Sequence, residues 1–90
     1  MDKIYKYILD PNNWTVELPK NSNIISAESQ GDNIVVYAIV NTEEKELRKV
    51  EIRVFGTGHN IDINLNYYIF LDTVKMYGGT LMFHVFYKWV

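Results

Sequence analysis

Hydrophobic and polar positions alternate with a period of two along most of this chain, which is the repeat of a β-strand. The clearest alternation runs over residues 48–55, where Val50, Ile52 and Val54 share one face and charged side chains fill the other. This pattern predicts a strand with one buried face and one solvated face. Similar patterns predict further strands at residues 3–9, 14–18, 23–29, 34–40, 67–77 and 80–90.

Two of the predicted strands are apolar on both faces. Residues 34–40 are apolar throughout and rich in β-branched side chains, which is typical of a strand covered on both sides. The last strand places Leu81, Phe83, Val85, Tyr87 and Trp89 on one side and Met82, His84, Phe86 and Val90 on the other. One face can cover the core, so the other needs a cover from the rest of the chain or from another subunit.

Turn residues separate these strands. Residues 10–13, 30–33 and 78–79 carry the Pro, Asn, Asp and Gly residues that tight turns favour. Residues 41–46 are predicted to be a charged, solvated connection, with one or two turns of helix over residues 42–49 as the alternative. Residues 60–66 are predicted to be an irregular polar stretch. Residues 1–90 are therefore predicted to form a single all-β domain, a compact antiparallel sandwich or small barrel of six to seven strands.

Length and composition narrow the class of protein. A domain of 90 residues buries only about 60–65% of its unfolded surface, and the chain has no cysteine for disulfides, so oligomerisation is the expected way to strengthen it. The net charge of −2 argues against nucleic-acid binding. The chain has neither an apolar run long enough to span a membrane nor a secretory signal, so the cytoplasm of a bacterial host cell is the expected location.

The aromatic residues are the strongest hint of function. Seven Tyr, four Phe and two Trp exceed what a small core can hold. They are explained by an interface, where aromatic residues are enriched, by a ligand pocket, where they stack on bases, or by their preference for strands. The predicted interface residues are Tyr68, Phe70, Phe83, His84, Phe86 and Trp89.

The segment Gly56-Thr57-Gly58-His59 is the candidate ligand-binding loop. Consecutive backbone N–H groups in a Gly-rich turn can converge on an anion, which makes this loop a candidate phosphate-binding nest. The alternative is a tight turn or β-bulge that needs glycine for its backbone angles. The spacing of a P-loop is absent.

Catalytic and metal sites are not predicted. His59 and His84 with Asp62 or Asp72 would form a legitimate metal set, but their spacing matches no metal motif, so no metal and no cofactor are expected. Asp72 interrupts an apolar strand. It is predicted to be a buried carboxylate with a perturbed pKa, or to lie at an edge, or to pair with a cation from Arg48, Arg53 or Lys75. A small enzyme using His59 with Asp62 remains an alternative, but no nucleophile motif supports catalysis.

Four segments together resemble a family of small phage and prophage proteins. They are Lys3-Ile4-Tyr5-Lys6-Tyr7, Val16-Glu17-Leu18-Pro19-Lys20, Gly56-Thr57-Gly58-His59 and Leu81-Met82-Phe83-His84-Val85-Phe86. The family is an uncharacterised small domain, so the resemblance implies a phage-type origin rather than an activity. The chain departs from the family pattern at Asn21, where Gly is usual, and at Asn60, where Pro often follows the histidine.

These observations favour a non-enzymatic binding protein of phage origin, acting as a homo-oligomer in counter-defence or host takeover. Its partner would be a host protein, or a small nucleotide-type signal held near residues 56–59. The alternative is a structural or assembly module of a phage particle, with residues 67–77 and 80–90 as the shared interface.

Overall fold

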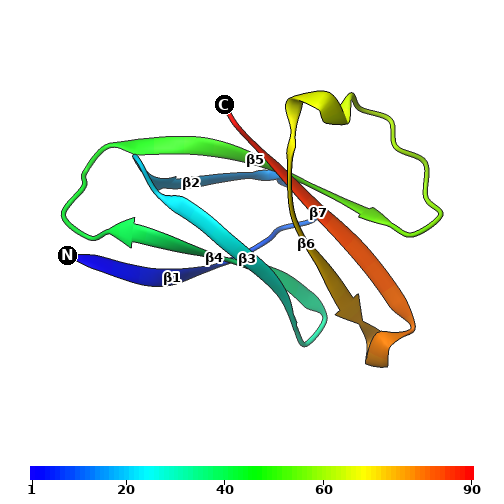
Figure 1. Ribbon diagram of the computed structural model, residues 1–90. Helices are drawn as coiled ribbons and strands as arrows, with labels where there is room; N and C mark the ends of the chain where they lie inside the picture. Colours follow the sequence, from blue (N-terminus) through cyan, green and yellow to red (C-terminus); the bar gives the residue numbers. More distant parts are fainter.

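The computed structural model describes residues 1–90 as two packed antiparallel sheets (Figure 1). The strands are β1 (Asp2–Ile8), β2 (Thr15–Pro19), β3 (Asn23–Gln30), β4 (Asn33–Asn41), β5 (Leu47–Gly56), β6 (Ile69–Met76) and β7 (Leu81–Trp89). Two short 3₁₀ turns, η1 (Leu65–Tyr67) and η2 (Tyr77–Gly79), flank β6. One sheet has the order β1-β4-β3 and the other β2-β5-β7-β6, so the predicted all-β sandwich is confirmed.

The core lies between the two sheets and follows the predicted alternation. Val50 and Ile52 of β5 are fully buried, and Val54 packs against them. The facing sheet contributes Val36 and Ala38 of β4. The core therefore forms from alternate residues of the central strands, as the pattern of period two requires.

β4 is apolar on both faces, but only one face is covered by the other sheet. Val35 on the outer face is nevertheless fully buried. Its neighbours in the sheet help to shield it, because the Nζ of Lys6 in β1 donates across β4 to the Oε1 of Gln30 in β3 at 2.7 Å. Local side chains on the same sheet thus replace the second protein layer that the sequence pattern indicates.

The charged segment before β5 forms no helix. Residues 42–46 make a turn in which the Glu44 N–H donates to the carbonyl oxygen of Asn41, and β5 begins at Leu47. The solvated connection is confirmed and the helical alternative is wrong. The reason is that Lys49 pairs with Glu17 in the sheet, which keeps Val50 pointing into the core.

One side of the sandwich is closed where the edge strands β3 and β6 meet. β6 has a bulge between Phe70 and Asp72, and Asp72 turns its carboxylate toward β3. Its Oδ2 accepts the backbone N–H of Ala27 at 3.1 Å, and its Oδ1 accepts that of Thr73 at 2.9 Å. Asp72 is therefore an edge residue, and it binds backbone N–H groups rather than a cation.

Loss of this link is expected to destabilise the whole sandwich. Asp72→Ala leaves the Ala27 N–H without a partner at a half-buried edge, so the free energy of unfolding should fall by about 1–3 kcal/mol. Asp62→Ala, in an exposed loop, is the matched control and should change the free energy by less than about 0.5 kcal/mol. Urea denaturation followed by circular dichroism measures both, and equal stability of the two variants would contradict the role of Asp72.

Candidate functional site

An open cavity of about 240 Å³ lies at the end of the sandwich where the β3–β4 and β6–β7 hairpins turn. We call it the end cavity. Side chains from five separate parts of the chain line it: Leu9, Pro11, Trp14, Asp32, Asn33, Ile34, Val54, Gly56, His59, Met76, Tyr77 and Phe83. The predicted ligand-binding loop thus contributes its first and last residues, Gly56 and His59, to this apolar-lined cavity.

His59 is held in this cavity by an unusually close contact with Gly56. The His59 N–H donates to the carbonyl oxygen of Gly56 at 3.0 Å, which closes the turn. A Cβ atom on Gly56 would lie 2.6 Å from the Cε1 and Nδ1 atoms of the His59 ring, so only glycine lets the ring approach the backbone here. Gly58 supplies the left-handed backbone of the turn, with a φ of 84°. The predicted tight turn is confirmed, and ligand binding by the loop stays a prediction.

Three aromatic side chains converge on the end cavity. Trp14 comes from the loop between β1 and β2, Tyr77 from the β6–β7 turn, and Phe83 from β7. Tyr77 has a φ of 53°, and left-handed angles are uncommon for residues other than glycine. Backbone strain of this kind clusters at functional sites, because the surrounding structure must hold it in place.

Polar groups at the rim complete the end cavity. Asp32 and Asn33 come from the β3–β4 hairpin, and His59 comes from the loop after β5. The carboxylate accepts hydrogen bonds, whereas the amide and the neutral imidazole each both accept and donate them. Together with the aromatic walls, they suit a flat ring that carries hydrogen-bonding groups on its edge.

The second candidate surface is the outer face of the β2-β5-β7-β6 sheet, which we call the outer face. Three phenylalanines form a row across it. The ring of Phe86 lies edge-on to Phe70 at 5.4 Å and to Phe55 at 6.3 Å between centroids. Phe70 is 53% exposed, whereas the other two are half-buried.

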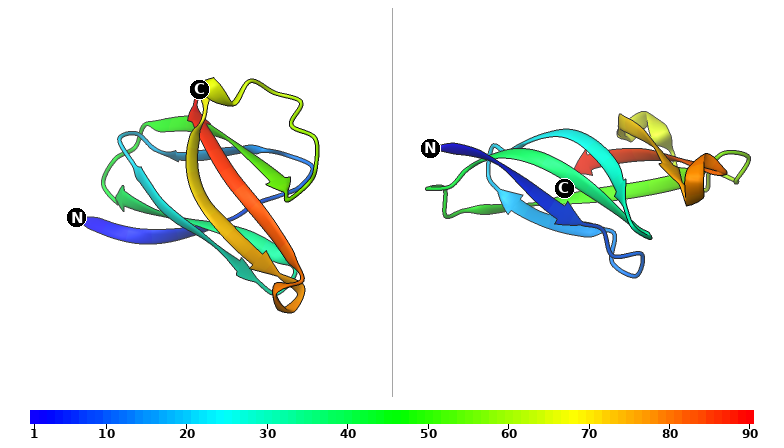
Figure 2. Two further views of the ribbon diagram at one scale, coloured as in Figure 1. Left: turned by 45° about the vertical axis from the view of Figure 1, so that its right-hand side comes forward. Right: turned by 90° about the horizontal axis from the view of Figure 1, so that it is seen from below.

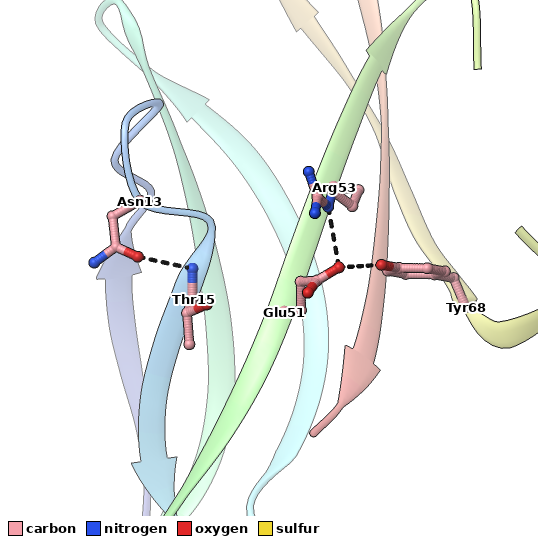
Figure 3. A network of polar contacts seen from close by, with 5 residues as sticks. All are labelled: Asn13, Thr15, Glu51, Arg53 and Tyr68. Atoms are coloured by element: carbon pink, nitrogen blue, oxygen red, sulfur yellow. Dashed lines mark hydrogen bonds and ion pairs between the residues drawn. The ribbon is translucent and has the colours of Figure 1, made fainter. Parts of the chain in front are cut away.

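A polar network lies beside this row (Figure 3). The Tyr68 hydroxyl and the Nε of Arg53 both donate to the Oε2 of Glu51, the latter at 3.0 Å. The Nζ of Lys88 lies 4.9 Å from the centroid of the Tyr68 ring. The hydrogen bond from Tyr68, helped by the Arg53 guanidinium, holds the pKa of the Glu51 carboxyl below its ordinary value. In the loop before the neighbouring strand β2, the Oδ1 of Asn13 accepts the backbone N–H of Thr15 at 3.2 Å.

His84 is fixed between two threonines on the outer face. Its Nε2 lies 2.8 Å from the hydroxyl of Thr57, and its Nδ1 lies 3.2 Å from that of Thr73. A neutral imidazole carries one donor and one acceptor, and each hydroxyl can serve as either, so both contacts are satisfied together. His84 therefore connects the loop after β5 with β6.

The predicted interface residues divide between the two sides of the sheet. Phe83 and Trp89 lie on the inner side, where they pack against the core, and Arg48 stacks 5.1 Å from the Trp89 ring. The residues that lie on the outer side are Tyr68, Phe70, His84 and Phe86. The β6–β7 hairpin thus buries most of one apolar face, on which Ile69 and Leu81 are still exposed. Phe70 is the exposed phenylalanine on the other face.

The two histidines lie in different environments. His59 borders the end cavity, whereas His84 is on the outer face and Asp72 is bound to the edge of β3. No three His, Cys, Asp or Glu side chains gather closely enough to hold a metal ion.

Sequence reasoning missed Trp14, Asp32 and Tyr77 as residues of the site. They belong to three turns that are far apart in the chain, and no local spacing connects them. The one available hint was the Gly78-Gly79 pair, since it marks the sharp turn that presents Tyr77.

The chain matches, over residues 1–90, the family described as "Domain of unknown function (DUF7352)". It belongs to this family. The expectation of an uncharacterised domain family is therefore confirmed. Searches of curated proteins and of solved structures found no match. No helix of the structure has the length and apolar character that crossing a membrane requires.

The Glu51 network is expected to make stability depend on pH in the acid range. Because folding lowers the pKa of Glu51 below 4.5, its contribution is full above that pH and is lost as the pH falls through the folded-state pKa. Tyr68→Phe should lower the free energy of unfolding by about 1 kcal/mol at pH 7 and by less at pH 3. Urea titrations at the two pH values test this, and an equal loss at both would contradict it. Tyr67→Phe, on an exposed neighbour, is the control.

Proposed function

We propose that this protein is a non-enzymatic binding protein that captures a nucleobase or nucleoside in the end cavity. The observation that carries the proposal is the convergence of Trp14, Tyr77 and Phe83 with the His59 ring around one hollow. Aromatic side chains stack on nucleobases, and such stacking is worth about 1–3 kcal/mol per base. The ligand would be the nucleotide-type signal expected from the aromatic surplus and the residues 56–59.

The size and charge of the cavity narrow the ligand further. Its volume of about 240 Å³ is below the range of roughly 300–1,000 Å³ that drug-sized ligands occupy. Asp32 at the rim would repel a phosphate, but it can accept hydrogen bonds from an exocyclic amino group. A base or a nucleoside therefore fits better than a dinucleotide, and any phosphate would stay in solvent.

A role in sequestration follows from what the site offers. The cavity presents stacking planes and hydrogen-bonding groups but no nucleophile with an adjacent base, so it supports retention of a ligand rather than its conversion. Together with a phage-type origin, retention of such a ligand would make the protein a stoichiometric counter-defence or host-takeover factor in the cytoplasm of the host cell. The alternative is a structural or assembly module of the phage particle, with the β6–β7 hairpin as its interface.

Binding of a host protein is the second candidate, and it would use the outer face. Phe70 is exposed there, as an interface residue must be. The end cavity is favoured because its aromatic residues converge on open space. On the outer face, by contrast, the phenylalanines pack against each other and Tyr68 already binds Glu51.

Nucleosides should bind with one-to-one stoichiometry and a Kd on the order of 10–100 μM, which is what a ligand of this size achieves. Trp14 lies in the cavity, so its fluorescence should be quenched as adenosine, guanosine, cytidine or uridine is added. Trp89→Phe removes the tryptophan at the far end of the sandwich and leaves Trp14 as the only reporter. Absence of binding by every base and nucleoside up to about 1 mM, confirmed by calorimetry, would refute the proposal.

Displacement of the His59 ring should weaken binding without unfolding the protein. Gly56→Ala places a methyl group 2.6 Å from ring atoms of His59, and the exposed ring can move away. Since the φ of Gly56 is not left-handed, the backbone accepts alanine. The expected result is a roughly tenfold higher Kd with a nearly unchanged midpoint of unfolding. His59→Ala should match it, whereas Asp62→Ala in the same loop should bind like the wild type. Unchanged affinity in the first two variants would remove His59 from the site.

A further inference from the structure

The outer edge of β1 carries unpaired backbone groups along its whole length. β1 pairs only with β4, and no strand lies on its other side (Figure 1). The Leu9 N–H donates to Ile34, and the Met1 carbonyl oxygen accepts from Thr42, so the odd-numbered residues of β1 face β4. In an antiparallel ladder this orientation alternates from residue to residue. The N–H and C=O groups that face outward therefore belong to Asp2, Ile4, Lys6 and Ile8.

The other three sheet edges are protected. β3 and β6 lie against each other, each has a bulge, and Asp72 links them. β2 has five residues and ends in a proline, which cannot donate to an added strand. β1 has seven residues and contains neither a bulge nor a proline. It is thus the one edge at which a further strand can pair along its length.

Apolar side chains lie beside this edge on the outer side of the sheet. Ile4 is opposite Ile39, Lys6 is opposite Tyr37, and Ile8 is opposite Val35. Ile4 is 61% exposed and Ile8 is 58% exposed. A partner strand at this edge would cover part of that apolar surface as well as pairing the backbone.

We propose that the partner is a second copy of this chain, whose β1 pairs antiparallel with β1 across a two-fold axis at Ile4. Each Ile4 then lies opposite its counterpart, and each Asp2 lies opposite Lys6 of the other copy. The two β1-β4-β3 sheets join into one continuous sheet of six strands. The contact is isologous, as in most homodimers, because the same surface serves on both sides.

Charge complementarity selects this register. It forms two Asp2–Lys6 pairs on one face of the sheet, and opposite charges directly across strands are stabilising. Shifting the axis to Lys3 places two Lys3 side chains opposite each other, and shifting it to Lys6 does the same for Lys6. An axis at Tyr5 places no charged residues opposite each other, so that register lacks the stabilising ion pairs. The lysines of β1 thus restrict how the edge pairs instead of blocking it.

The dimer needs only a small rearrangement and leaves the end cavity open. Lys6 must release the Oε1 of Gln30, which is an exposed contact, and turn its Nζ toward Asp2 of the other copy. Only residues 2–6 of β1 pair in the dimer. Leu9, which lines the end cavity, follows β1 and lies outside the paired segment. Ligand binding and dimer formation are therefore independent.

Charge reversal tests the register directly. Multi-angle light scattering on the protein with a C-terminal tag should show a monomer–dimer equilibrium with a Kd on the order of 10–100 μM, as expected for a small interface. Asp2→Lys and Lys6→Asp should each weaken the dimer about tenfold, because two like-charged pairs form in place of two ion pairs. The double variant D2K/K6D should restore it. A monomer at all concentrations up to about 1 mM, or a double variant that is no better than either single one, would overturn the proposal.

Cysteine cross-linking gives a second, independent readout, since the chain has no cysteine of its own. Ile4→Cys should form an intermolecular disulfide under mild oxidation, because opposed residues in a ladder lie within the Cα separation that a disulfide spans. Tyr5→Cys should not, because Tyr5 faces Lys3 in this register. Both positions are exposed, so the variants should fold, and circular dichroism verifies this. Cross-linking of Tyr5→Cys in preference to Ile4→Cys would overturn the proposed register.

Discussion

The structure depends on how the edges of its two sheets satisfy their backbone hydrogen bonds. Two open sheets have four edges, and a chain of 90 residues is too short to cover them all. The chain closes one side by bringing β3 and β6 together, with the Asp72 carboxylate accepting the free Ala27 N–H across the gap. A bulge in each of these strands turns it toward the other, so irregular pairing here is the means of closure.

The remaining features follow from that one-sided closure. With β3 and β6 joined, β1 and β2 are left as free edges, and only β2 is short and ends in a proline. At one end of the sandwich the hairpins and the loop after β5 surround a hollow instead of filling it, which gives the end cavity. The loop from β5 to β6 extends away from the body of the sandwich, as both views of Figure 2 show, and residues 56–59 lie where this loop begins. A larger chain would have had further elements to cover these sites.

The sequence predicted the strands well because their periodicity is a local property. The alternation of Val50, Ile52 and Val54 required no knowledge of the partner strands. Asp72 was ambiguous, since its acceptor role depends on an N–H that lies 45 residues away in the chain. The terminal strand shows the same limit: periodicity separated Phe83 from His84 by face, but it could not tell which face the second sheet would cover.

The candidate site was predictable in part, for a related physical reason. Gly56 and His59 could be predicted from the sequence. The close approach of the His59 ring to the backbone and the sharp turn both require glycine, and glycine is visible in the local sequence. No local sequence pattern marks Trp14 and Tyr77 as residues of the site, since separate turns bring them together only at one end of the folded sandwich. When a site is built from segments that are far apart in the chain, the sequence reveals only those of its residues, such as glycines in turns, that the local backbone conformation requires.

Residues 56–59 are anchored on both sides of their sheet, and this bears on how well the end cavity can bind. Thr57 donates its N–H to the carbonyl oxygen of Met82 at 3.1 Å, and its hydroxyl contacts His84 on the outer face. Two residues later, His59 lies against Gly56 in the cavity. His84 in turn contacts Thr73 of β6, so the loop is tied to two strands besides its own. A wall that is ordered before the ligand arrives loses little conformational entropy on binding, so even a small cavity can retain a small ligand.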